Sequence, residues 1–555
     1  MQLSLACSIV IETYECNKNR NNKFKNIHLI LKKSYVMRLK TKYLVLIISG
    51  FLSLNSTIAQ QYCAVIPLPS KAEFQKTSFL LNQYTPVLIS DKSLKPVANY
   101  LQKELLRNYD IPLVLQSTST KPSIKLNLIK EGNKEAYTLQ MNSTGITISA
   151  SGTAGAFYGI ISFLQILSQG KAEAGAIAAS CWNIIDEPRY SWRGFMLDES
   201  RYFFGKEKVK SILDWMAFYK LNRFHWHLTD EPGWRIEIKK YPMLALVGGI
   251  GNHANPFAPA MFYTQEDIKE IVSYATERHI IIIPEIDMPG HATAANRAYP
   301  EFSGGGSEKY PDFTFNPGYE KTYSYLTNIL RETTALFPGG ILHLGGDEVS
   351  FGSEKWLSNE NIKRLMKTNN LHSAKDVEKY FMERMADSVY QLNAKLLAWD
   401  EVADLNLSAA KTIIFWWRQD KPQQLKTALQ KNYEVVLCPR LPFYFDFVQD
   451  SSHTMGRKWG GKFSSLEDVY DFKASGLPEV QSQNAKQILG IQANLWTETI
   501  YTEQRLDTML FPRIAALAET AWTMDSKKDF AGFKQRLVSH FALYEKAGIL
   551  YYKPF

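Results

Sequence analysis

The 555-residue sequence predicts an α/β protein in which a (β/α)8 TIM barrel is preceded by a small α+β domain. From residue 186 onward, short apolar runs alternate with helical segments of one to two dozen residues, a pattern typical of repeated βα units. Polar and aromatic residues follow nearly every run. In a TIM barrel the loops after the strands carry the functional site, so this placement favours a barrel with a site at that end.

Eight strand candidates and five helical stretches make up the predicted barrel. The strands are expected at residues 191–197, 223–228, 280–284, 341–344, 395–399, 412–417, 434–437 and 489–495. The helices are expected at residues 206–220, 265–278, 319–336, 375–392 and 423–431. A doubly wound open sheet is the alternative. No GxGxxG motif follows the first strand, which counts against a dinucleotide-binding version of that fold.

Residues 60–185 are expected to form the separate N-terminal domain. Alternating apolar and polar positions predict strands at 124–128 and 146–150, and helical spacing predicts helices at 94–109 and 155–167. No group of residues in this domain suggests chemistry, so we expect a scaffold. The barrel is expected to span residues 186–525, and residues 526–555 are expected to form a C-terminal helical segment.

Residues 1–59 are predicted to be a leader that contains a secretory signal peptide. A basic stretch precedes an apolar run at 43–54, and a small-x-Ala cleavage site ends at Ala59. A membrane anchor is the alternative, but the apolar run is short for a span. Met37 directly precedes the basic stretch, so we expect translation to start there. The mature chain is then expected in a periplasm or outside the cell, with no membrane span.

The charge of the chain does not indicate a nucleic-acid partner. The formal net charge is +9, but residues 1–59 contribute +7 of it from nine basic and two acidic residues, which leaves about +2. Three cysteines would remain after cleavage, namely Cys63, Cys181 and Cys438. Their odd number and the lack of CxxC spacing predict neither a disulfide framework nor a zinc site.

The stretch at residues 341–349 holds two adjacent carboxylates, Asp347 and Glu348. A short apolar run predicts a buried strand, and two glycines then allow a tight turn before the pair. Paired carboxylates suit acid/base chemistry because like charges push their pKa values apart. An exposed acidic turn is the alternative. Polar residues at the other strand ends, such as Asp198 and Arg201 after the first strand, favour the functional interpretation.

His225 and His227 raise the possibility of a metal-dependent hydrolase. Two histidines spaced by one on a strand face the same way and could bind an ion. Such a site needs further ligands after later strands, and among the remaining histidines only His291 is well placed. We therefore expect a core or hydrogen-bonding role for the pair, and neither a metal nor another cofactor.

Carboxylates together with many aromatic residues fit glycoside chemistry. The chain contains 12 Trp, 29 Tyr and 30 Phe, and such rings stack on the apolar faces of pyranose sugars. Adjacent residues such as Asp347 and Glu348 cannot easily flank a glycosidic bond from opposite faces. Their adjacency fits a mechanism in which the substrate provides its own nucleophile.

Five ordered motifs resemble glycoside hydrolase family 20, the exo-acting β-N-acetylhexosaminidases. They are WRGFMLDESR at 192–201, FHWHLTD at 224–230, PEIDMPGH at 284–291, HLGGDEV at 343–349 and FPRIAALAE at 511–519. A looser match relates residues 62–180 to the noncatalytic N-terminal domain of that family. The resemblance covers almost the whole chain after the leader.

The resemblance implies a role for each matching residue. Glu348 would be the general acid and then the base, and Asp347 would orient the 2-acetamido group of the substrate. Asp230 and His291 would form a polar chain that supports Glu348. The remaining expected residues would bind the sugar: Arg193 the 3- and 4-hydroxyls, Glu498 the 4- and 6-hydroxyl side, Asp446 the region of O6, Tyr444 the acetamido oxygen, and Trp399, Trp417 and Trp496 the acetamido methyl and the ring.

The resemblance therefore implies an exported, retaining hydrolase that removes terminal β-linked GlcNAc or GalNAc from glycans through an oxazolinium intermediate. One alternative is a lacto-N-biosidase-like activity that releases a disaccharide. Another is a catalytically silent glycan-binding protein. A glycan is the only partner expected, and the sequence indicates no oligomeric state.

Overall fold

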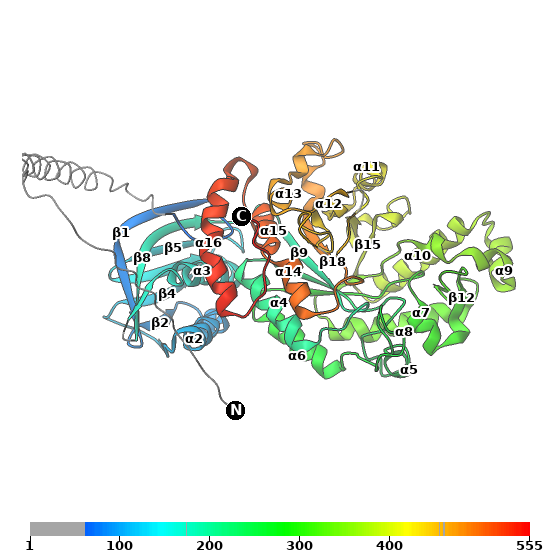
Figure 1. The fold of residues 1–555 in the computed structure, drawn as a ribbon, viewed down its shortest axis with the longest axis horizontal. Helices are drawn as coiled ribbons and strands as arrows, with labels where there is room; N and C mark the ends of the chain where they lie inside the picture. The colour runs from blue at the N-terminus through cyan, green and yellow to red at the C-terminus, as the bar shows by residue number, and fades with distance from the viewer. Residues whose placement is uncertain (1–61, 174, 454–455, 459–460) are drawn as a thin grey trace, which may run out of the picture. The chain divides into compact units, whose positions relative to one another are not determined.

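A computed structural model describes residues 62–173, 175–453, 456–458 and 461–555 of the chain (Figure 1). The predicted leader, its signal peptide and the start at Met37 lie outside these residues. Among the described helices, none combines the length and the apolar character that crossing a membrane requires.

The carboxyl-terminal part of the chain forms a closed barrel of eight parallel strands, which confirms the predicted fold class. The strands lie in the order β10-β11-β14-β15-β16-β17-β18-β9, and pairing between β18 and β9 closes the ring. Each strand begins and ends within one residue of its predicted limits. The bounds are β9 Trp192–Asp198, β10 Arg223–His227, β11 Ile281–Glu285, β14 Ile341–His343, β15 Lys395–Trp399, β16 Thr412–Trp416, β17 Glu434–Leu437 and β18 Ile488–Leu495.

Helices follow most barrel strands and cover the outside of the barrel (Figure 1). They are α4 Lys206–Phe218, α6 Gln265–Thr276, α8 Glu320–Leu336, α10 Ala374–Gln391, α11 Pro422–Gln430, α14 Glu503–Leu510 and α15 Arg513–Trp522. Between β15 and β16 the described chain has only short 3₁₀ turns, at Asp400–Val402 and Ala409–Lys411. This agrees with the sequence, in which no helical stretch is predicted between these two strands.

The loops after several strands are long and carry small elements of their own. They hold α5 Met243–Leu246, α7 Thr293–Ala298, β12 Ser303–Gly305, β13 Thr314–Phe315, α9 Glu360–Asn369, α12 Arg440–Phe443 and α13 Leu466–Asp471. Because these loops follow the carboxyl ends of the strands, they build the face at which barrel enzymes place their sites.

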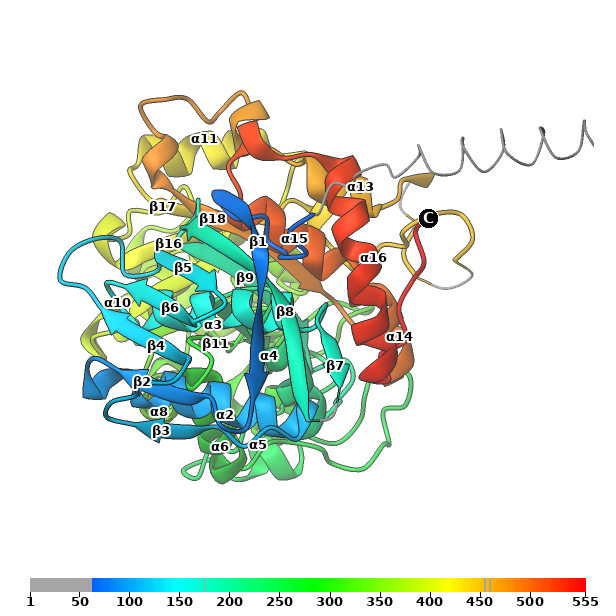
Figure 2. The same cartoon turned by 90° about the vertical axis from the view of Figure 1, so that its left-hand side faces the viewer.

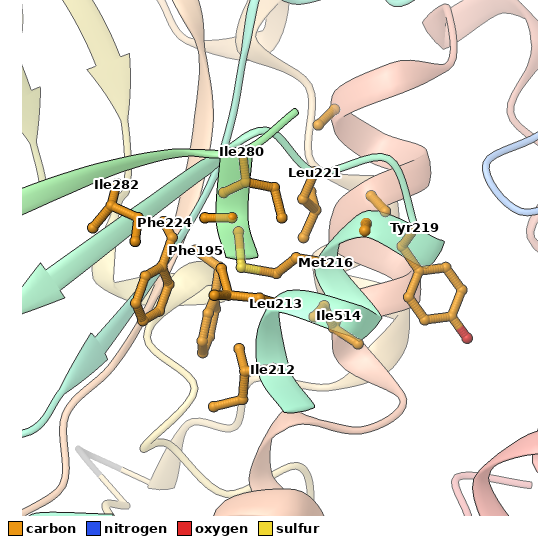
Figure 3. Close-up of a cluster of buried hydrophobic side chains, with 14 of the residues drawn as sticks. Phe195, Ile212, Leu213, Met216, Tyr219, Leu221, Phe224, Ile280, Ile282 and Ile514 are labelled. Carbon is orange, nitrogen blue, oxygen red and sulfur yellow. The ribbon is translucent and has the colours of Figure 1, made fainter. Parts of the chain in front are cut away.

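A layer of apolar side chains joins the barrel strands to the surrounding helices (Figure 3). Phe195 from β9 and Phe224 from β10 meet Leu213 and Met216 from α4, and Ile514 of α15 lies at the same cluster. All five side chains are fully buried. Strands that are covered on both faces must be apolar on both, which is why they appear in the sequence as continuous apolar runs.

The N-terminal domain is a mixed sheet with strand order β1-β8-β5-β6-β4-β2-β3. Figure 2 shows β1 beside β8, with which it pairs in antiparallel register. Helix α3 (Thr153–Leu167) packs against the central strands, and α2 (Lys95–Tyr109) packs against α3. The strands are β1 Lys71–Asn82, β2 Pro86–Ile89, β3 Val114–Gln116, β4 Ser123–Leu128, β5 Tyr137–Asn142, β6 Gly145–Ala150, β7 Lys171–Glu173 and β8 Ala176–Asp186. The last helix of the chain, α16, spans Phe530–Lys546.

Buried polar contacts attach this domain to the amino-terminal end of the barrel strands. Lys220, just before β10, donates to Asp186 Oδ2 at 3.1 Å and to the Tyr137 hydroxyl at 2.9 Å. Both members of the Lys220–Asp186 ion pair have fully buried side chains. The domain therefore covers the end of the barrel opposite to the long loops, and it leaves the carboxyl-terminal end open.

Candidate active site

The carboxyl-terminal ends of the barrel strands surround a pocket that nine of the eleven predicted site residues line. These nine are His291, Asp347, Glu348, Trp399, Trp417, Tyr444, Asp446, Trp496 and Glu498. A tenth, Asp230, lies directly beneath the pocket and is 1% exposed. Arg193 is the exception and lies elsewhere. These ten residues come from seven different strand ends and meet at one place, as the barrel topology requires.

Two glycines set the turn that presents the carboxylate pair. Gly345 and Gly346 follow β14 with φ values of 65° and 92°. A Cβ atom added at Gly345 would lie 1.8 Å from Oδ1 of Asp287, so only glycine fits there. Glu348 itself has φ 52°, which is uncommon for a residue with a side chain. Backbone held in such a conformation is often found at functional sites.

The two carboxylates lie in different surroundings. The Asp347 side chain is 11% exposed, whereas the Glu348 side chain is 36% exposed and lies at the mouth of the pocket. Burial raises the pKa of Glu348, and the neighbouring charge of Asp347 raises it further. No described residue donates a hydrogen bond to Oδ1 of Asp347, although the atom is buried. Glu348 is therefore suited to hold a proton, and Asp347 offers a free acceptor.

A chain of charged groups runs from the carboxylate pair into the barrel. His291 Nε2 lies 3.6 Å from Asp347 Oδ2 and 3.7 Å from Glu348 Oε2, and His291 Nδ1 lies 3.1 Å from Asp230 Oδ1. Burial alone would lower the pKa of His291, but Asp230 foremost, then Glu231 and Asp347, raise it well above its usual range. The imidazole is thus held as a cation beside the pair.

Below this chain, the carboxylate of Glu285 contacts side chains from several strands. His227 Nδ1 lies 2.5 Å from Glu285 Oε2, and His343 Nδ1 lies 2.9 Å from Glu285 Oε1. Burial would raise the pKa of Glu285, but His343, His227 and His225 outweigh it and hold the pKa well below its usual range. His227 hydrogen-bonds to this buried carboxylate, and His225 accepts a hydrogen bond at Nδ1 from the side-chain amide of Gln492 at 3.1 Å, so both histidines have the hydrogen-bonding role that the sequence predicts.

Aromatic rings wall the pocket. Trp417 stacks on Tyr444 with ring centroids 6.1 Å apart and planes at 13°, and Trp399 lies 6.0 Å from Trp496. Burial raises the pKa of the Tyr444 hydroxyl well above its usual range, so this group stays a neutral donor at every working pH.

Buried carboxylates orient two of the tryptophans. The indole N–H of Trp399 donates to Glu285 Oε1 at 2.9 Å, and the indole N–H of Trp417 donates to Glu401 Oε2 at 3.1 Å. Burial raises the pKa of Glu401 well above its usual range, and the charge of Asp400 is the second contribution. The sequence offers a signal for Glu401, which comes two residues after β15, but neither carboxylate was expected to position a tryptophan.

Acidic and basic groups face each other at the other end of the pocket. Arg457 contacts Asp446, with Nε 3.1 Å from Oδ2, and it also pairs with Glu498. Burial raises the pKa of Asp446 to about 7. Arg457 comes from the long loop after β17, and no motif in the sequence indicates that it reaches the pocket.

The prediction that Arg193 lies in the pocket is wrong. Arg193 is fully buried near the amino-terminal end of β9, where the N-terminal domain covers the barrel. Its Nη2 donates to Glu135 Oε1 at 2.7 Å and to the Tyr158 hydroxyl at 2.9 Å. Its Nε and Nη1 donate to the carbonyl oxygens of Lys220 and Tyr190. The second N–H of Nη1 donates to Glu135 Oε2 at 3.2 Å, so no donor remains for a ligand, and the pocket lies at the opposite end of the strand.

Arg201 occupies the pocket instead. It follows the end of β9 by three residues, and its Nη1 lies 2.5 Å from Asp230 Oδ2. Its guanidinium lies over the ring of Trp496, 5.0 Å from the centroid. The same motif in the sequence holds both arginines, and the strand-end rule separates them, because only Arg201 follows the strand.

Comparison with known proteins places these features in a family. The sequence pattern described as "Glycosyl hydrolase family 20, catalytic domain" matches residues 190–525, and that described as "Glycosyl hydrolase family 20, domain 2" matches residues 62–186.

Individual relatives agree with the family match. A beta-hexosaminidase of Porphyromonas gingivalis is 34% identical over 88% of this chain, which spans 64% of the length of that relative. A beta-hexosaminidase of Vibrio furnissii is 31% identical over 82% of this chain and 76% of its own. Among solved structures, the exo beta-N-acetylglucosaminidase of Vibrio harveyi in complex with N-acetylglucosamine superposes with a TM-score of 0.82 at 31% identity, over 89% of this chain and 79% of that one.

Proposed function

The chain belongs to glycosyl hydrolase family 20, and we propose that it removes terminal, non-reducing β-linked N-acetylhexosamine, GlcNAc or GalNAc, from glycans. The observation that carries this proposal is the adjacent pair Asp347 and Glu348 inside an aromatic-walled pocket. A sugar ring presents apolar faces to aromatic side chains and hydroxyls to charged ones, and this pocket offers both kinds of surface.

Catalysis is proposed to use the 2-acetamido group of the substrate as the nucleophile. Glu348 protonates the leaving oxygen, and the acetamido carbonyl oxygen attacks C1 to give an oxazolinium ion. Asp347 accepts a hydrogen bond from the acetamido N–H through its unpartnered Oδ1 and stabilises the positive charge. Glu348 then takes a proton from the incoming water, and the two displacements together retain the configuration at C1.

The aromatic wall is proposed to hold the acetamido group in position for this attack. Trp399, Trp417 and Trp496 surround its methyl, and Tyr444 donates a hydrogen bond to its oxygen. Nucleophile and C1 must meet in one geometry, and an oriented intramolecular attack can reach a high effective concentration. The hydrogen bonds that lock Trp399 and Trp417 support this role, because a wall that rotates could not fix the group.

The charged end of the pocket is proposed to bind the sugar hydroxyls. Arg201 takes the role that the sequence assigned to Arg193, as donor to the 3- and 4-hydroxyls, because it lies beside Asp230 and Trp496 at the pocket. Asp446 and Glu498 accept hydrogen bonds from the 4- and 6-hydroxyl side, and a buried oxygen of each has no donor among the described residues.

His291 and Asp230 are proposed to tune the acid. As a cation 3.7 Å from Glu348, His291 favours the charged carboxylate, while Asp347 and burial favour the protonated acid. The net shift of the Glu348 pKa is upward and His291 limits it, which suits a group that gives and then takes a proton. Asp230 holds His291 charged from below.

Release of a single sugar is favoured over a lacto-N-biosidase-like activity because the pocket is one aromatic-walled site that holds the proposed acid, and because similar proteins are named beta-hexosaminidases. A silent glycan-binding protein has no need for a strained glutamate whose pKa is raised beside a second carboxylate.

We also propose export to a periplasm or to the outside of the cell, which rests on the sequence of residues 1–59 alone.

Hydrolysis of nitrophenyl β-GlcNAc and β-GalNAc by the wild type and two variants tests the proposed function. Glu348→Gln should lose general-acid help, least for good leaving groups, and Asp347→Asn should lose the help of the acetamido group. Asp347→Asn should lower kcat by at least about a hundredfold on both nitrophenyl substrates, and Glu348→Gln should do so on methyl β-GlcNAc, whose leaving group is poor. Full activity of both variants would show that the mechanism is wrong.

A further inference from the structure

A second cavity lies outside the barrel, where the N-terminal domain meets the helices of the barrel. Helices α2 and α3 of that domain and helices α4, α6 and α16 surround it, and all five are labelled in Figure 1. Its volume is about 630 Å³, within the roughly 300–1,000 Å³ of small-molecule sites, which often lie at domain interfaces. It shares no lining residue with the catalytic pocket, so the proposed reaction gives it no role.

Helical periodicity brings one face of α4 to this cavity. Ser211, Asp214, Trp215 and Phe218 line it, and residues with this spacing lie on one side of a helix. The buried residues of α4 occupy the positions between them and pack towards the barrel (Figure 3). All four lining side chains are half-buried. This face of α4 is therefore neither packed away nor fully open to solvent.

Aromatic rings supply much of the cavity wall. Trp215 lies edge-on to Phe218, with centroids 5.4 Å apart, and edge-on to Tyr544 at 5.0 Å, so packing fixes the indole. Tyr109 of α2 and Tyr274 of α6 add rings from two other helices. Fixed aromatic surfaces in a concave site suit a ligand that has flat apolar faces.

The charges that line the cavity cancel. Three acidic and three basic side chains line it, namely Glu104, Glu207, Asp214, Arg107, Lys210 and Lys546. Arg107 Nη2 lies 2.7 Å from Glu104 Oε2. The two lysines pair with Glu270 and with the carbonyl oxygen of Asn108. An anionic ligand would have to compete with these partners for the basic groups, so the cavity suits a neutral ligand.

Three neutral polar groups in the wall are open to a ligand. No described residue forms a hydrogen bond with the Tyr109 hydroxyl, the Ser211 hydroxyl or the indole N–H of Trp215. A hydroxyl can donate and accept, and an indole N–H donates only. Together with the aromatic surfaces, these groups match a ring that carries hydroxyls and no charge.

We infer that this cavity is a second sugar-binding site, which holds a neutral pyranose of a glycan away from the catalytic pocket. The aromatic rings meet the C–H faces of the pyranose, and the neutral polar groups meet its hydroxyls. The choice of a sugar among neutral ring-shaped ligands rests on the proposed function, because a glycan is the partner which that function requires. Attachment at a second place raises the effective concentration of a large glycan at the catalytic pocket.

Calorimetric titration of the full chain with a tetrasaccharide of β-1,4-linked GlcNAc tests this site. A thiazoline analogue of the oxazolinium ion first fills the catalytic pocket, so the tetrasaccharide is neither cleaved nor bound there. One equivalent of tetrasaccharide should still bind. Ser168→Trp on α3 and Ala547→Trp at the end of α16 each place an indole in the cavity and should weaken this binding at least about tenfold. Both variants should keep kcat/KM for nitrophenyl β-GlcNAc within about twofold of wild type.

Ala531→Trp provides the matched control, because Ala531 is exposed on α16 and does not line the cavity. This variant should bind the tetrasaccharide as the wild type does. Equal thiazoline affinity shows that a variant is folded, and if one cavity variant fails this check the other decides.

Three results would overturn the second site: no binding by the thiazoline-filled wild type, unchanged binding by the folded cavity variants, or an equal loss in the control. A wild type that neither hydrolyses nitrophenyl β-GlcNAc nor binds the thiazoline would instead refute the proposed function. In that case tetrasaccharide binding without the inhibitor, lost in the cavity variants and kept in the control, would still support the second site.

Discussion

Replacing each of the two arginines in the first barrel motif by lysine should have opposite effects on activity and stability. Arg201→Lys keeps a positive charge near Asp230 but loses the planar fork, which now lies 2.5 Å from the Asp230 carboxylate and over Trp496. In the proposed function one or more hydrogen bonds from a charged donor to the sugar hydroxyls are lost. Such bonds contribute about 1.5–3 kcal/mol each. We therefore expect kcat/KM to fall by about 10- to 150-fold.

Arg193→Lys should instead lower stability and leave the chemistry intact. The lysine keeps the charge opposite Glu135, but it cannot reproduce the donors to Tyr158, Tyr190 and Lys220. The loss of these three buried hydrogen bonds, at about 0.5–1.5 kcal/mol each, corresponds to about 1.5–4.5 kcal/mol of unfolding free energy. Thermal unfolding should shift to lower temperature, while kcat/KM per active site, counted by titration with a thiazoline inhibitor, should stay within about twofold of wild type.

These two variants also test which arginine serves the pocket, Arg201 as the structure indicates or Arg193 as the motif suggested. A large fall in kcat/KM per active site for Arg193→Lys, together with an unchanged value for Arg201→Lys, would refute our assignment of the pocket arginine. Equal falls in both would mean that the N-terminal domain acts on the pocket across the barrel, which no contact described above requires.

Two further perturbations follow from the electrostatics and from the turn. His291→Gln removes a cation that lowers the pKa of Glu348, so the pKa of Glu348 should rise. The alkaline limb of the pH profile of kcat/KM, measured with nitrophenyl β-GlcNAc, should then move to higher pH. A shift of this limb to lower pH would contradict the proposed role of His291. Gly345→Ala would place a Cβ atom 1.8 Å from Oδ1 of Asp287, at a residue with a φ of 65°, so the turn must distort. Activity should therefore fall at least about a hundredfold. A variant with nearly full activity and unchanged stability would show that the turn tolerates a side chain.

The barrel could be predicted from the sequence because its strands are buried on both faces. Mainly apolar runs such as residues 395–399 and 434–437, separated by helical segments, are best explained as buried strands. Their limits are those of β15 and β17. Helix ends were predicted less well. The helix expected at 206–220 ends at Phe218, because Lys220 turns back with φ 59° to form the buried pair with Asp186. That pair joins segments far apart in the chain, and local periodicity carries no information on it.

The site was predictable to the extent that strand ends define it. Glu348 and His291 come five and six residues after the ends of their strands, so the barrel topology brings them to the same face. The prediction for Arg193 failed because the motif at 192–201 contains two arginines and does not show which of them lies at the pocket end of the strand. Arg457 could not be predicted, since it enters the pocket from a long loop after β17 whose path depends on tertiary contacts.

One electrostatic arrangement serves both halves of the proposed reaction. Glu348 must keep its proton until the leaving oxygen needs it, and the oxazolinium ion must be stabilised once that oxygen has left. Asp347 raises the pKa of Glu348 and lies where the cation forms, so the same charge meets both needs. Without a cation nearby, burial and the charge of Asp347 would raise the pKa of Glu348 further. His291, kept charged by Asp230 3.1 Å away, offsets part of that effect and so allows Glu348 to release and regain the proton within one cycle.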